Sequence, residues 1–300
     1  MQSVHTDGTV RRDHGNLRNF YIPDMHGCMG NSQGEHMNDN TVAQSYNTHA
    51  AQWAERLREG NNPAHRFLEK PAMFAKLPDL TGCRVLCVGC GSGEEVDMLL
   101  ARGAAHVHGI DISESLIELA RQAYPHSAKN GFIATFEVAA MEDRQSFEDG
   151  TFDYIYSSLT LHYSDDWSAI LAEMSRLLRP GGRMLFSTHH PVKWGGQVVR
   201  GEEQDTFTMG YVRPKAGMPT VQGDYMGSRR ITDTWFGSMT VEYYHRPLSA
   251  IMRDILSSGL ELLDFAEPMP ADEAKTENPG FWEIHSKIPL FMIFELKKGE

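Results

Sequence analysis

Residues 85–93 read VLCVGCGSG and decide the fold of this chain of 300 residues. The apolar run from Val85 to Val88 is typical of a short buried strand, and a helix is expected to begin at Glu94. The three glycines between them allow tight backbone turns and let a ligand approach main-chain atoms. A structural turn without a ligand is the simplest alternative. The stretch predicts a strand, a glycine loop and a helix, with a ligand site at the loop.

Acidic residues after the loop indicate which class of ligand the loop can bind. Carboxylates of Glu94 and Glu95 at a helix N-terminus would disfavour a bound pyrophosphate. Glu94 also stands where the dinucleotide-binding pattern G-x-G-x-x-G requires its third glycine. Asp111 closes the next expected strand, 20 residues after Gly91 (111 − 91), where a carboxylate can bind ribose hydroxyls. An exposed surface carboxylate is the alternative for Asp111, but together these residues favour an adenosine-type ligand without phosphates over a nicotinamide dinucleotide.

Strand and helix patterns alternate on both sides of this stretch. Strands are expected at residues 84–88, 106–110, 134–139, 152–157, 183–187, 260–265 and 290–296. Helices are expected from about 38 to 57 and at 64–77, 94–101, 113–124, 167–178 and 248–258, the second kinked near Pro71. This order predicts an α/β fold: a Rossmann-like, seven-stranded, mostly parallel sheet with helices on both faces and an antiparallel last strand. Ligands of such sheets bind at the carboxyl ends of the strands.

Three regions are expected along the chain. Residues 1–37 lack apolar periodicity and are interpreted as a flexible N-terminal tail, and residues 38–300 as one domain. Within the domain, residues 192–240 show no clear strand–helix order, with seven glycines from Gly195 to Gly227, and end in a β-like run at 239–244. Long irregular segments are usually functional or disordered, so residues 192–240 are expected to be an irregular insertion that covers a substrate.

Charge and composition exclude several classes of function. The net charge of −12 and the absence of a basic cluster argue against a nucleic-acid partner. No apolar run reaches the roughly 18–20 residues of a membrane helix, and no secretion signal precedes the domain, so no membrane partner and a cytoplasmic location are expected. Cys87 and Cys90 form a C-x-x-C pair without further ligands nearby, so no metal site is expected. The sequence does not specify an oligomeric state.

Four motifs in order resemble those of class I S-adenosylmethionine-dependent methyltransferases. They are VLCVGCGSG (85–93), GIDIS (109–113), FDYIYSSLTLHY (152–163) and LLRPGG (177–182). The match is closest to the small-molecule group similar to ubiquinone/menaquinone methylases, and residues 70–73, 187–191 and 243–252 resemble a bacterial subgroup of it. The resemblance covers roughly residues 38–300. It implies an enzyme that uses S-adenosylmethionine and releases S-adenosylhomocysteine, with a small-molecule acceptor and O- or N-methylation.

The resemblance also implies which residues bind the cofactor. Asp111 would hold both ribose hydroxyls, and Tyr46 would form an aromatic lid. The other implied contacts are Gly89, Cys90 and Gly91 under the methionine and ribose, Ile112, Met141 and Glu142 at the adenine, and Ser158 and Leu159 beside the methionine. Cys87 departs from the family pattern, which usually has Asp there, and Met141 stands where an acidic residue is common.

The acceptor side is expected to combine histidines with aromatic walls. Methyl transfer needs mainly an aligned acceptor, and a base only where the acceptor still carries its proton. His190 is the first candidate for that contact because it follows a buried strand, with His189 and His245 as further candidates. The expected pocket residues are His162, Trp194, Trp235, Tyr243 and Tyr244. Ordinary packing is the alternative for each, and a non-catalytic S-adenosylmethionine-binding protein or a protein or nucleic-acid methylase is the alternative function.

Overall fold

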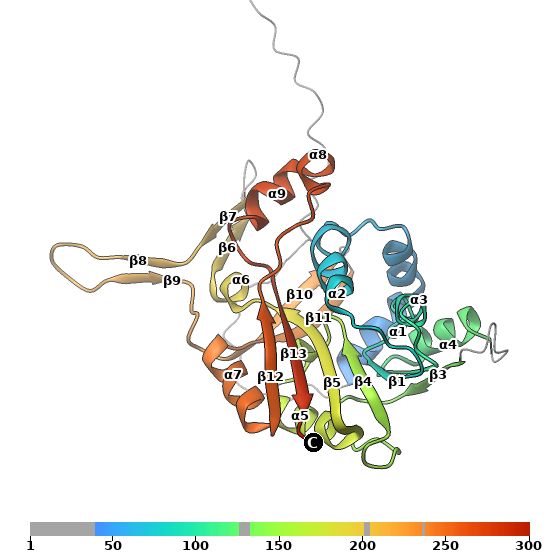
Figure 1. Ribbon diagram of the computed structural model, residues 1–300. Coiled ribbons are helices and arrows are strands. Elements are labelled where there is room, and N and C mark those ends of the chain that lie inside the picture. Colours follow the sequence, from blue (N-terminus) through green and yellow to red (C-terminus); the bar gives the residue numbers. More distant parts are fainter. Residues whose placement is uncertain (1–39, 126–132, 201–204, 236–237) are drawn as a thin grey trace, which may run out of the picture.

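The computed structural model describes residues 40–125, 133–200, 205–235 and 238–300 (Figure 1). The expected N-terminal tail, residues 1–37, lies outside the described residues. The first described element is helix α1 (Asn40–Arg58), which packs on helix α4 (Glu114–Ala123).

A seven-stranded sheet forms the centre of the molecule, in the order β12-β13-β5-β4-β1-β2-β3. Its strands are β1 (Arg84–Val88), β2 (His106–Asp111), β3 (Ile133–Val138), β4 (Phe152–Ser157), β5 (Leu178–His189), β12 (Leu260–Ala266) and β13 (Phe291–Lys298). Strands β1 to β5 pair in parallel, whereas β13, the last strand, pairs antiparallel with both β5 and β12. The expected α/β fold class, with its antiparallel last strand, is confirmed.

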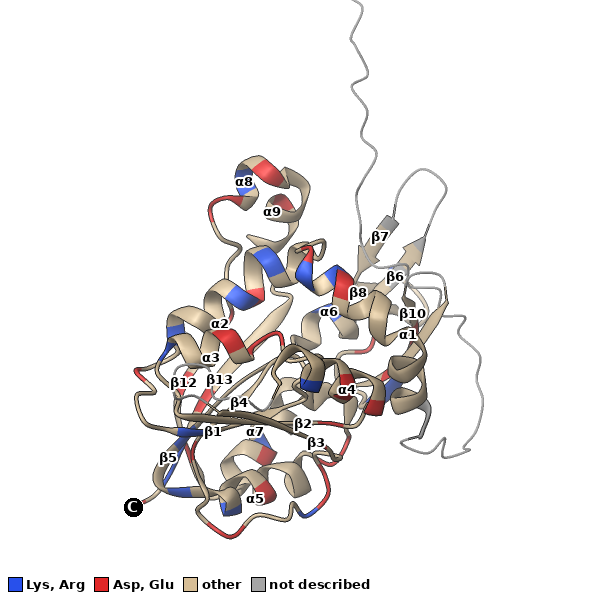
Figure 2. Ribbon diagram, turned by 90° about the vertical axis from the view of Figure 1, so that its right-hand side faces the viewer, with Lys and Arg blue, Asp and Glu red and all other residues tan. Residues whose placement is uncertain are grey.

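Helices cover both faces of this sheet (Figure 2). Helices α2 (Lys70–Lys76), α3 (Val96–Ala101) and α4 lie on one face, and α5 (Trp167–Leu177) and α7 (Leu248–Ser257) lie on the other. Alternate residues of β1 supply the two cores, because side chains of a strand point to opposite faces. Val85 and Cys87 pack with α2, α3 and α4, while Leu86 and Val88 pack with α5 and α7.

The order of the strands fixes where a ligand can bind. From β1 the chain moves to β2 and β3 on one side, and then returns to β4 and β5 on the other. The carboxyl ends of β1 and β4 therefore diverge into loops on opposite sides of a crevice, the usual ligand position in such sheets.

Two expected elements differ in detail for local reasons. The helix expected at 64–77 is divided into a π-helix, η1 (His65–Glu69), and α2, because Pro71 removes a backbone donor from a continuous helix. Strand β5 begins at Leu178 rather than Arg183. Its pairing with β4 jumps from Phe152–Leu178 to Tyr154–Arg183, so Pro180, Gly181 and Gly182 form a bulge inside the strand.

The expectation that residues 192–240 are irregular is wrong for the described residues. A short helix, α6 (Pro191–Gly195), leads into three antiparallel pairs. They are β6 (Gln197–Arg200) with β7 (Asp205–Thr208), β8 (Gly210–Val212) with β9 (Thr220–Gln222), and β10 (Arg229–Trp235) with β11 (Met239–His245). The β8–β9 hairpin projects away from the body of the protein (Figure 1). Two short helices, α8 (Ala274–Glu277) and α9 (Pro279–His285), precede β13.

Candidate active site

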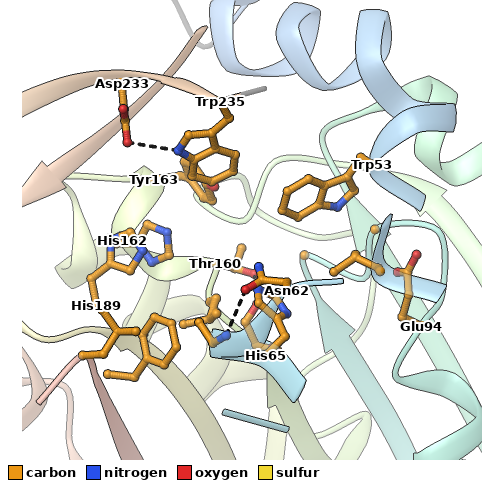
Figure 3. A pocket seen from close by; sticks show the side chains of 18 of the residues that line it. Trp53, Asn62, His65, Glu94, Thr160, His162, Tyr163, His189, Asp233 and Trp235 are labelled. Atoms are coloured by element: carbon orange, nitrogen blue, oxygen red, sulfur yellow. Dashed lines mark hydrogen bonds between the residues drawn. The ribbon is translucent and has the colours of Figure 1, made fainter. Parts of the chain in front are cut away.

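A cavity of about 430 Å³ lies at the carboxyl ends of β1, β2, β4 and β5. Helices α1, α6 and α9 and strands β7 and β10 complete its walls. In Figure 3, Glu94 lies on one side of this cavity and His162 and His189 lie on the other, with Thr160 between them. We call the side of the glycine loop and Asp111 the cofactor half, and the side of His162, His189, Trp194 and Trp235 the acceptor half.

The glycine loop is tied to the neighbouring strand and leaves no room for a side chain. The backbone N–H groups of Gly89 and Cys90 both donate to the Ile110 carbonyl, at 2.8 and 3.0 Å. Gly89 has a φ of 67°, and a Cβ atom there would lie 2.2 Å from Thr160 Oγ1. Glycine is required at this position both by the left-handed backbone and by the close approach of Thr160.

Asp111 holds the loop from the end of β2. Its Oδ2 accepts from the Gly91 N–H and its Oδ1 from the Ser113 N–H, both at 2.9 Å. Burial raises the pKa of Asp111, and the two backbone donors oppose this effect. Because a carboxylate oxygen can accept more than one hydrogen bond, Asp111 keeps acceptor capacity for two hydroxyl groups. Ser113, the first residue of the helix expected at 113–124, caps α4 by accepting from the Leu116 N–H at 3.2 Å.

A strained turn follows β4 on the opposite wall of the cofactor half. Leu159 has a φ of 49°, the only positive value for a non-glycine residue in the described chain. This backbone conformation costs about 1–3 kcal/mol. The N–H of Leu159 donates to Ser187 Oγ at 3.0 Å, which holds the turn against β5.

All ten residues that the sequence assigns to the cofactor line this one cavity. They are Tyr46, Gly89, Cys90, Gly91, Asp111, Ile112, Met141, Glu142, Ser158 and Leu159. Their individual contacts stay predictions. The cofactor half is also acidic, since Glu94, Asp111 and Glu142 line it in addition to Glu95, whose charge is paired with Lys70. This charge suits a ligand that carries a sulfonium and an ammonium group, and it opposes a pyrophosphate.

An aromatic chain closes the cavity between α1 and β10. The hydroxyls of Tyr46 and Tyr163 share a hydrogen bond of 2.6 Å, and Tyr46 packs edge-on against Trp53 at 5.5 Å between ring centroids. Trp53 in turn stacks on Trp235, at 5.5 Å and 15°. Trp53 lies on α1, the helix that the sequence predicts from about residue 38 to 57. Its side chain lines the cavity and does not pack on the central sheet.

A buried carboxyl group fixes the orientation of Trp235. Asp233 is 1% exposed and its Oδ2 accepts from Trp235 Nε1 and from the Tyr243 hydroxyl, both at 3.0 Å. Burial raises the pKa of Asp233. Sequence reasoning missed Asp233, whose only signal is a carboxylate in an otherwise half-apolar strand, two residues before Trp235.

Two stacked imidazoles form a wall of the acceptor half. The rings of His162 and His189 lie 3.6 Å apart at 16°. Burial lowers the pKa of His162 to about 3, and burial together with the neighbouring His162 and Lys193 lowers the pKa of His189 well below its ordinary value. Nδ1 of each ring is buried without a hydrogen-bond partner in the described part of the chain. Both rings are therefore neutral at pH 7, and they can give or accept a hydrogen bond but carry no charge.

His190, the first candidate from the sequence, does not line the cavity. It is 3% exposed, its Nε2 donates to Glu267 Oε1 at 2.7 Å, and its Nδ1 accepts from the Val192 N–H at 3.1 Å, which caps α6. Neighbouring side chains at a strand end point to opposite sides, so only one of His189 and His190 can face the crevice. The expectation that His190 faces the acceptor therefore does not fit the structure.

Three further acceptor-side expectations also fall outside the cavity wall: His245, Tyr243 and Tyr244. His245 donates from Nε2 to the Tyr225 carbonyl at 3.0 Å, and Tyr243 packs behind His189 at 5.1 Å between ring centroids. These residues support the wall rather than form it. Of the predicted acceptor-side residues, the structure brings His162, His189, Trp194 and Trp235 to the cavity.

Comparisons with known proteins agree with this geometry. Residues 86–186 match the family described as "Methyltransferase domain". The chain is similar to the crystal structure of an S-adenosylmethionine-dependent methyltransferase from Mesorhizobium loti, with 26% identity and a TM-score of 0.63, over 78% of this chain and 98% of that one. Residues 86–186 therefore form a methyltransferase domain, and the chain resembles class I S-adenosylmethionine-dependent methyltransferases.

Two relatives show how far this similarity extends. The chain is 38% identical over 115 residues to a ubiquinone biosynthesis O-methyltransferase of Xylella fastidiosa, a match over 38% of this chain and 45% of that protein. It is also 26% identical over 246 residues to an uncharacterized protein of Haemophilus influenzae, over 80% of this chain and 91% of that protein. The expected S-adenosylmethionine cofactor and the resemblance to ubiquinone-type methylases are confirmed. Within the described residues, no helix is long and apolar enough to cross a membrane, and no cluster of His, Cys, Asp and Glu has the form of a metal site.

Proposed function

We propose that this methyltransferase transfers the methyl group of S-adenosylmethionine to an oxygen or nitrogen atom of a small molecule bound in the acceptor half. The observation that carries the proposal is the single cavity, in which the glycine loop and Asp111 share one space with His162, His189 and Trp235. A cavity of this size is typical of small-molecule sites. Its walls on several sides favour a small acceptor over a protein or nucleic acid, and so does the net charge of −12.

The residues of the cofactor half fit S-adenosylmethionine, which supplies an electrophilic methyl group. Asp111 would hold the ribose hydroxyls through its remaining acceptor positions. Ile112, Met141 and Glu142 would surround the adenine, and the Gly89–Gly91 loop with the turn at Ser158 and Leu159 would hold the methionine end. Glycine at position 89 lets the loop pack directly against Thr160, which keeps the loop and the turn after β4 close together at this site.

The aromatic residues of the acceptor half would align a planar acceptor and exclude water. Trp194, Trp235 and Phe291 line this half and offer ring faces or edges for stacking. Alignment of the acceptor behind the methyl carbon can contribute about 7–11 kcal/mol. Residues 193–194, 206–207, 233 and 235 come from the segment expected to cover the substrate, and their place in the wall supports that role.

His189 and His162 would orient the acceptor by hydrogen bonds and would not act as general bases. An imidazole whose pKa lies near 3, as burial imposes on His162, is a weak base at neutral pH. Its neutral ring still accepts a hydrogen bond from a hydroxyl or amine, which would point a lone pair of the acceptor at the methyl group. The similarity to ubiquinone biosynthesis O-methyltransferases favours a hydroxyl group on a flat ring as the acceptor. The proton of that hydroxyl would pass to solvent as the O–CH3 bond forms and the S–CH3 bond breaks.

The test is the appearance of S-adenosylhomocysteine in the presence of defined acceptors. Purified protein is supplied with S-adenosylmethionine and with matched phenols, catechols and anilines, and separately with protein and RNA fractions. Turnover with at least one ring-bearing small molecule, and none with the macromolecular fractions, is expected. Turnover with protein or RNA alone, or no turnover despite tight binding of S-adenosylhomocysteine, would contradict the proposal.

A further inference from the structure

A fully buried carboxyl group lies behind the wall of the cofactor half. Glu69, at the end of the π-helix η1, is 0% exposed and does not line the cavity. Its Oε1 accepts from Ser158 Oγ at 2.8 Å and from Ser187 Oγ at 2.7 Å. Its Oε2 is buried without a hydrogen-bond partner in the described chain. A carboxyl group in such a place is costly, so its position against two serine hydroxyls requires an explanation.

The two serines connect this carboxyl group to the strained turn after β4. Ser158 is the residue before Leu159, and Ser187 Oγ accepts from the Leu159 N–H at 3.0 Å. Both Ser158 and Leu159 line the cofactor half, whereas Ser187 does not. Glu69 thus joins the carboxyl ends of β4 and β5 at the one non-glycine residue that the described chain holds at a positive φ.

The segment that carries Glu69 also contacts the cavity on both sides of it. His65, four residues earlier, lines the cavity, and Lys70, the next residue, forms an ion pair with the cavity residue Glu95. Cys87, which stands where the family usually has Asp, is buried, and burial raises the pKa of its thiol to about 12. The end of β1 therefore provides a neutral thiol at this position, whereas η1 supplies the carboxyl group that contacts Ser158 and Ser187.

We propose that Glu69 is a positioning residue for cofactor binding, whose carboxyl group holds the Ser158–Leu159 turn in its left-handed conformation through Ser158 and Ser187. The proposal rests on the assignment of Ser158 and Leu159 to the methionine end of S-adenosylmethionine. Glu69 acts through these two residues and does not contact the ligand itself. Its loss would release a turn that costs free energy to hold, and the wall of the cofactor half would change shape.

Calorimetric titration with S-adenosylhomocysteine tests this role. The wild-type protein is titrated first, since absence of heat there would mean that the cofactor assignment has failed, independently of Glu69. Glu69→Met removes both acceptor oxygens at similar volume, and it is expected to weaken binding about tenfold or more, the usual effect of losing hydrogen bonds to a charged group. Glu69→Gln keeps one carbonyl oxygen for the serines and is expected to bind within about threefold of wild type.

Glu242→Met provides a matched control. Glu242 is another buried carboxyl group, 7% exposed, but its Oε1 accepts from Thr232 on the β10–β11 pair, and it does not line the cavity. This variant is expected to melt at a lower temperature and to bind S-adenosylhomocysteine with unchanged affinity. An equal loss of affinity in Glu242→Met would show that any buried carboxyl group has this effect, and would overturn the proposal.

A milder variant keeps the proposal testable if Glu69→Met does not fold. Ser187→Ala removes one hydroxyl of the network and touches no cavity residue except through Leu159. It is expected to weaken binding about threefold to tenfold. Wild-type affinity in Ser187→Ala, or in folded Glu69→Met, would overturn the proposed role.

Discussion

The two halves of the cavity differ in how they are built. Apart from Tyr46 on α1, the expected cofactor residues lie in loops that directly follow β1, β2, β3 and β4, so they are consecutive with strands whose positions the sheet fixes. The acceptor half is assembled from the end of β5, a 3₁₀ turn (Leu161–Tyr163), α6 and the β10 strand, which come together only through tertiary packing. Most residues of the cofactor half thus lie next in sequence to the strands that position them, whereas those of the acceptor half come from segments distant in sequence.

The most damaging change to the cofactor half is expected to be Gly89→Ala. A Cβ atom at this position would lie 2.2 Å from Thr160 Oγ1, and the φ of 67° disfavours any side chain. Together these effects cost about 2–5 kcal/mol, so affinity for S-adenosylhomocysteine should fall by about 30-fold or more. Gly82→Ala is the control, because its φ of 77° is similar but nothing lies within 4 Å of the added atom. Equal affinities in the two variants, measured by calorimetry, would mean that the loop does not approach the ligand.

Asp111→Ala should have the next largest effect. The ribose contact and the anchor of the Gly91 N–H are both lost, so cofactor affinity should fall by about 1.5–3 kcal/mol, or roughly 10- to 150-fold. Acceptor affinity measured at saturating cofactor should stay unchanged. A folded Asp111→Ala variant that binds S-adenosylhomocysteine like wild type would contradict the division of the cavity into two halves.

Two variants, His189→Gln and His190→Gln, compare a residue that lines the acceptor half with one that lies behind it. His189 lines the cavity, so its loss should lower turnover at least about tenfold while affinity for S-adenosylhomocysteine stays within about twofold. His190 lies behind the wall, paired with Glu267, so its loss should lower the melting temperature and affect turnover less. The opposite ranking of the two turnover numbers would restore His190 as the residue that contacts the acceptor.

The stability of the protein should depend on pH through the buried imidazole of His162. Its pKa is about 3 in the folded protein and about 6.5 when unfolded, so below pH 6.5 the unfolded chain binds more protons. The free energy of unfolding should therefore be fully present above pH 6.5 and fall by up to about 1.4 kcal/mol per pH unit below it. Denaturant titrations of wild type and His162→Gln from pH 7.5 to 5 measure this slope. Parallel curves for the two proteins would show that His162 is not held neutral by burial.

The sequence could predict the sheet and the cofactor half for one physical reason. A glycine loop and the carboxylate after the next strand are placed by parallel pairing alone, so their spacing in the chain determines their meeting in space. The positions of Gly89 and Asp111 in the site could therefore be predicted without knowing how distant segments of the chain pack. The same holds for Ser113, whose side chain caps the helix that follows it.

The acceptor half could not be predicted with the same accuracy. The sequence places the end of β5 at Ser187, whereas pairing with β13 extends it to His189, opposite Phe291. That extension decides which of two adjacent histidines faces the cavity, and it depends on a strand about 100 residues later in the chain (291 − 189 = 102). Strands β6 to β9 of the segment after His190 are only three or four residues long, too short to show a clear alternating pattern.

Glu69 and Asp233 illustrate what pattern reasoning overlooks. Each is a carboxyl group whose role comes from partners distant in sequence: Ser158 and Ser187 for Glu69, and Tyr243 for Asp233. A single acidic residue in a helix or strand normally indicates solvent exposure. Only the packed structure shows that these two are buried.

A crystal structure of the protein with S-adenosylhomocysteine tests the division of the cavity most directly. The adenosine is predicted to lie against Asp111 and Ile112, with the sulfur atom directed toward the space bounded by His162, His189 and Trp235. A ligand bound in this cavity with its sulfur directed away from that space, or bound outside the cavity, would contradict the account.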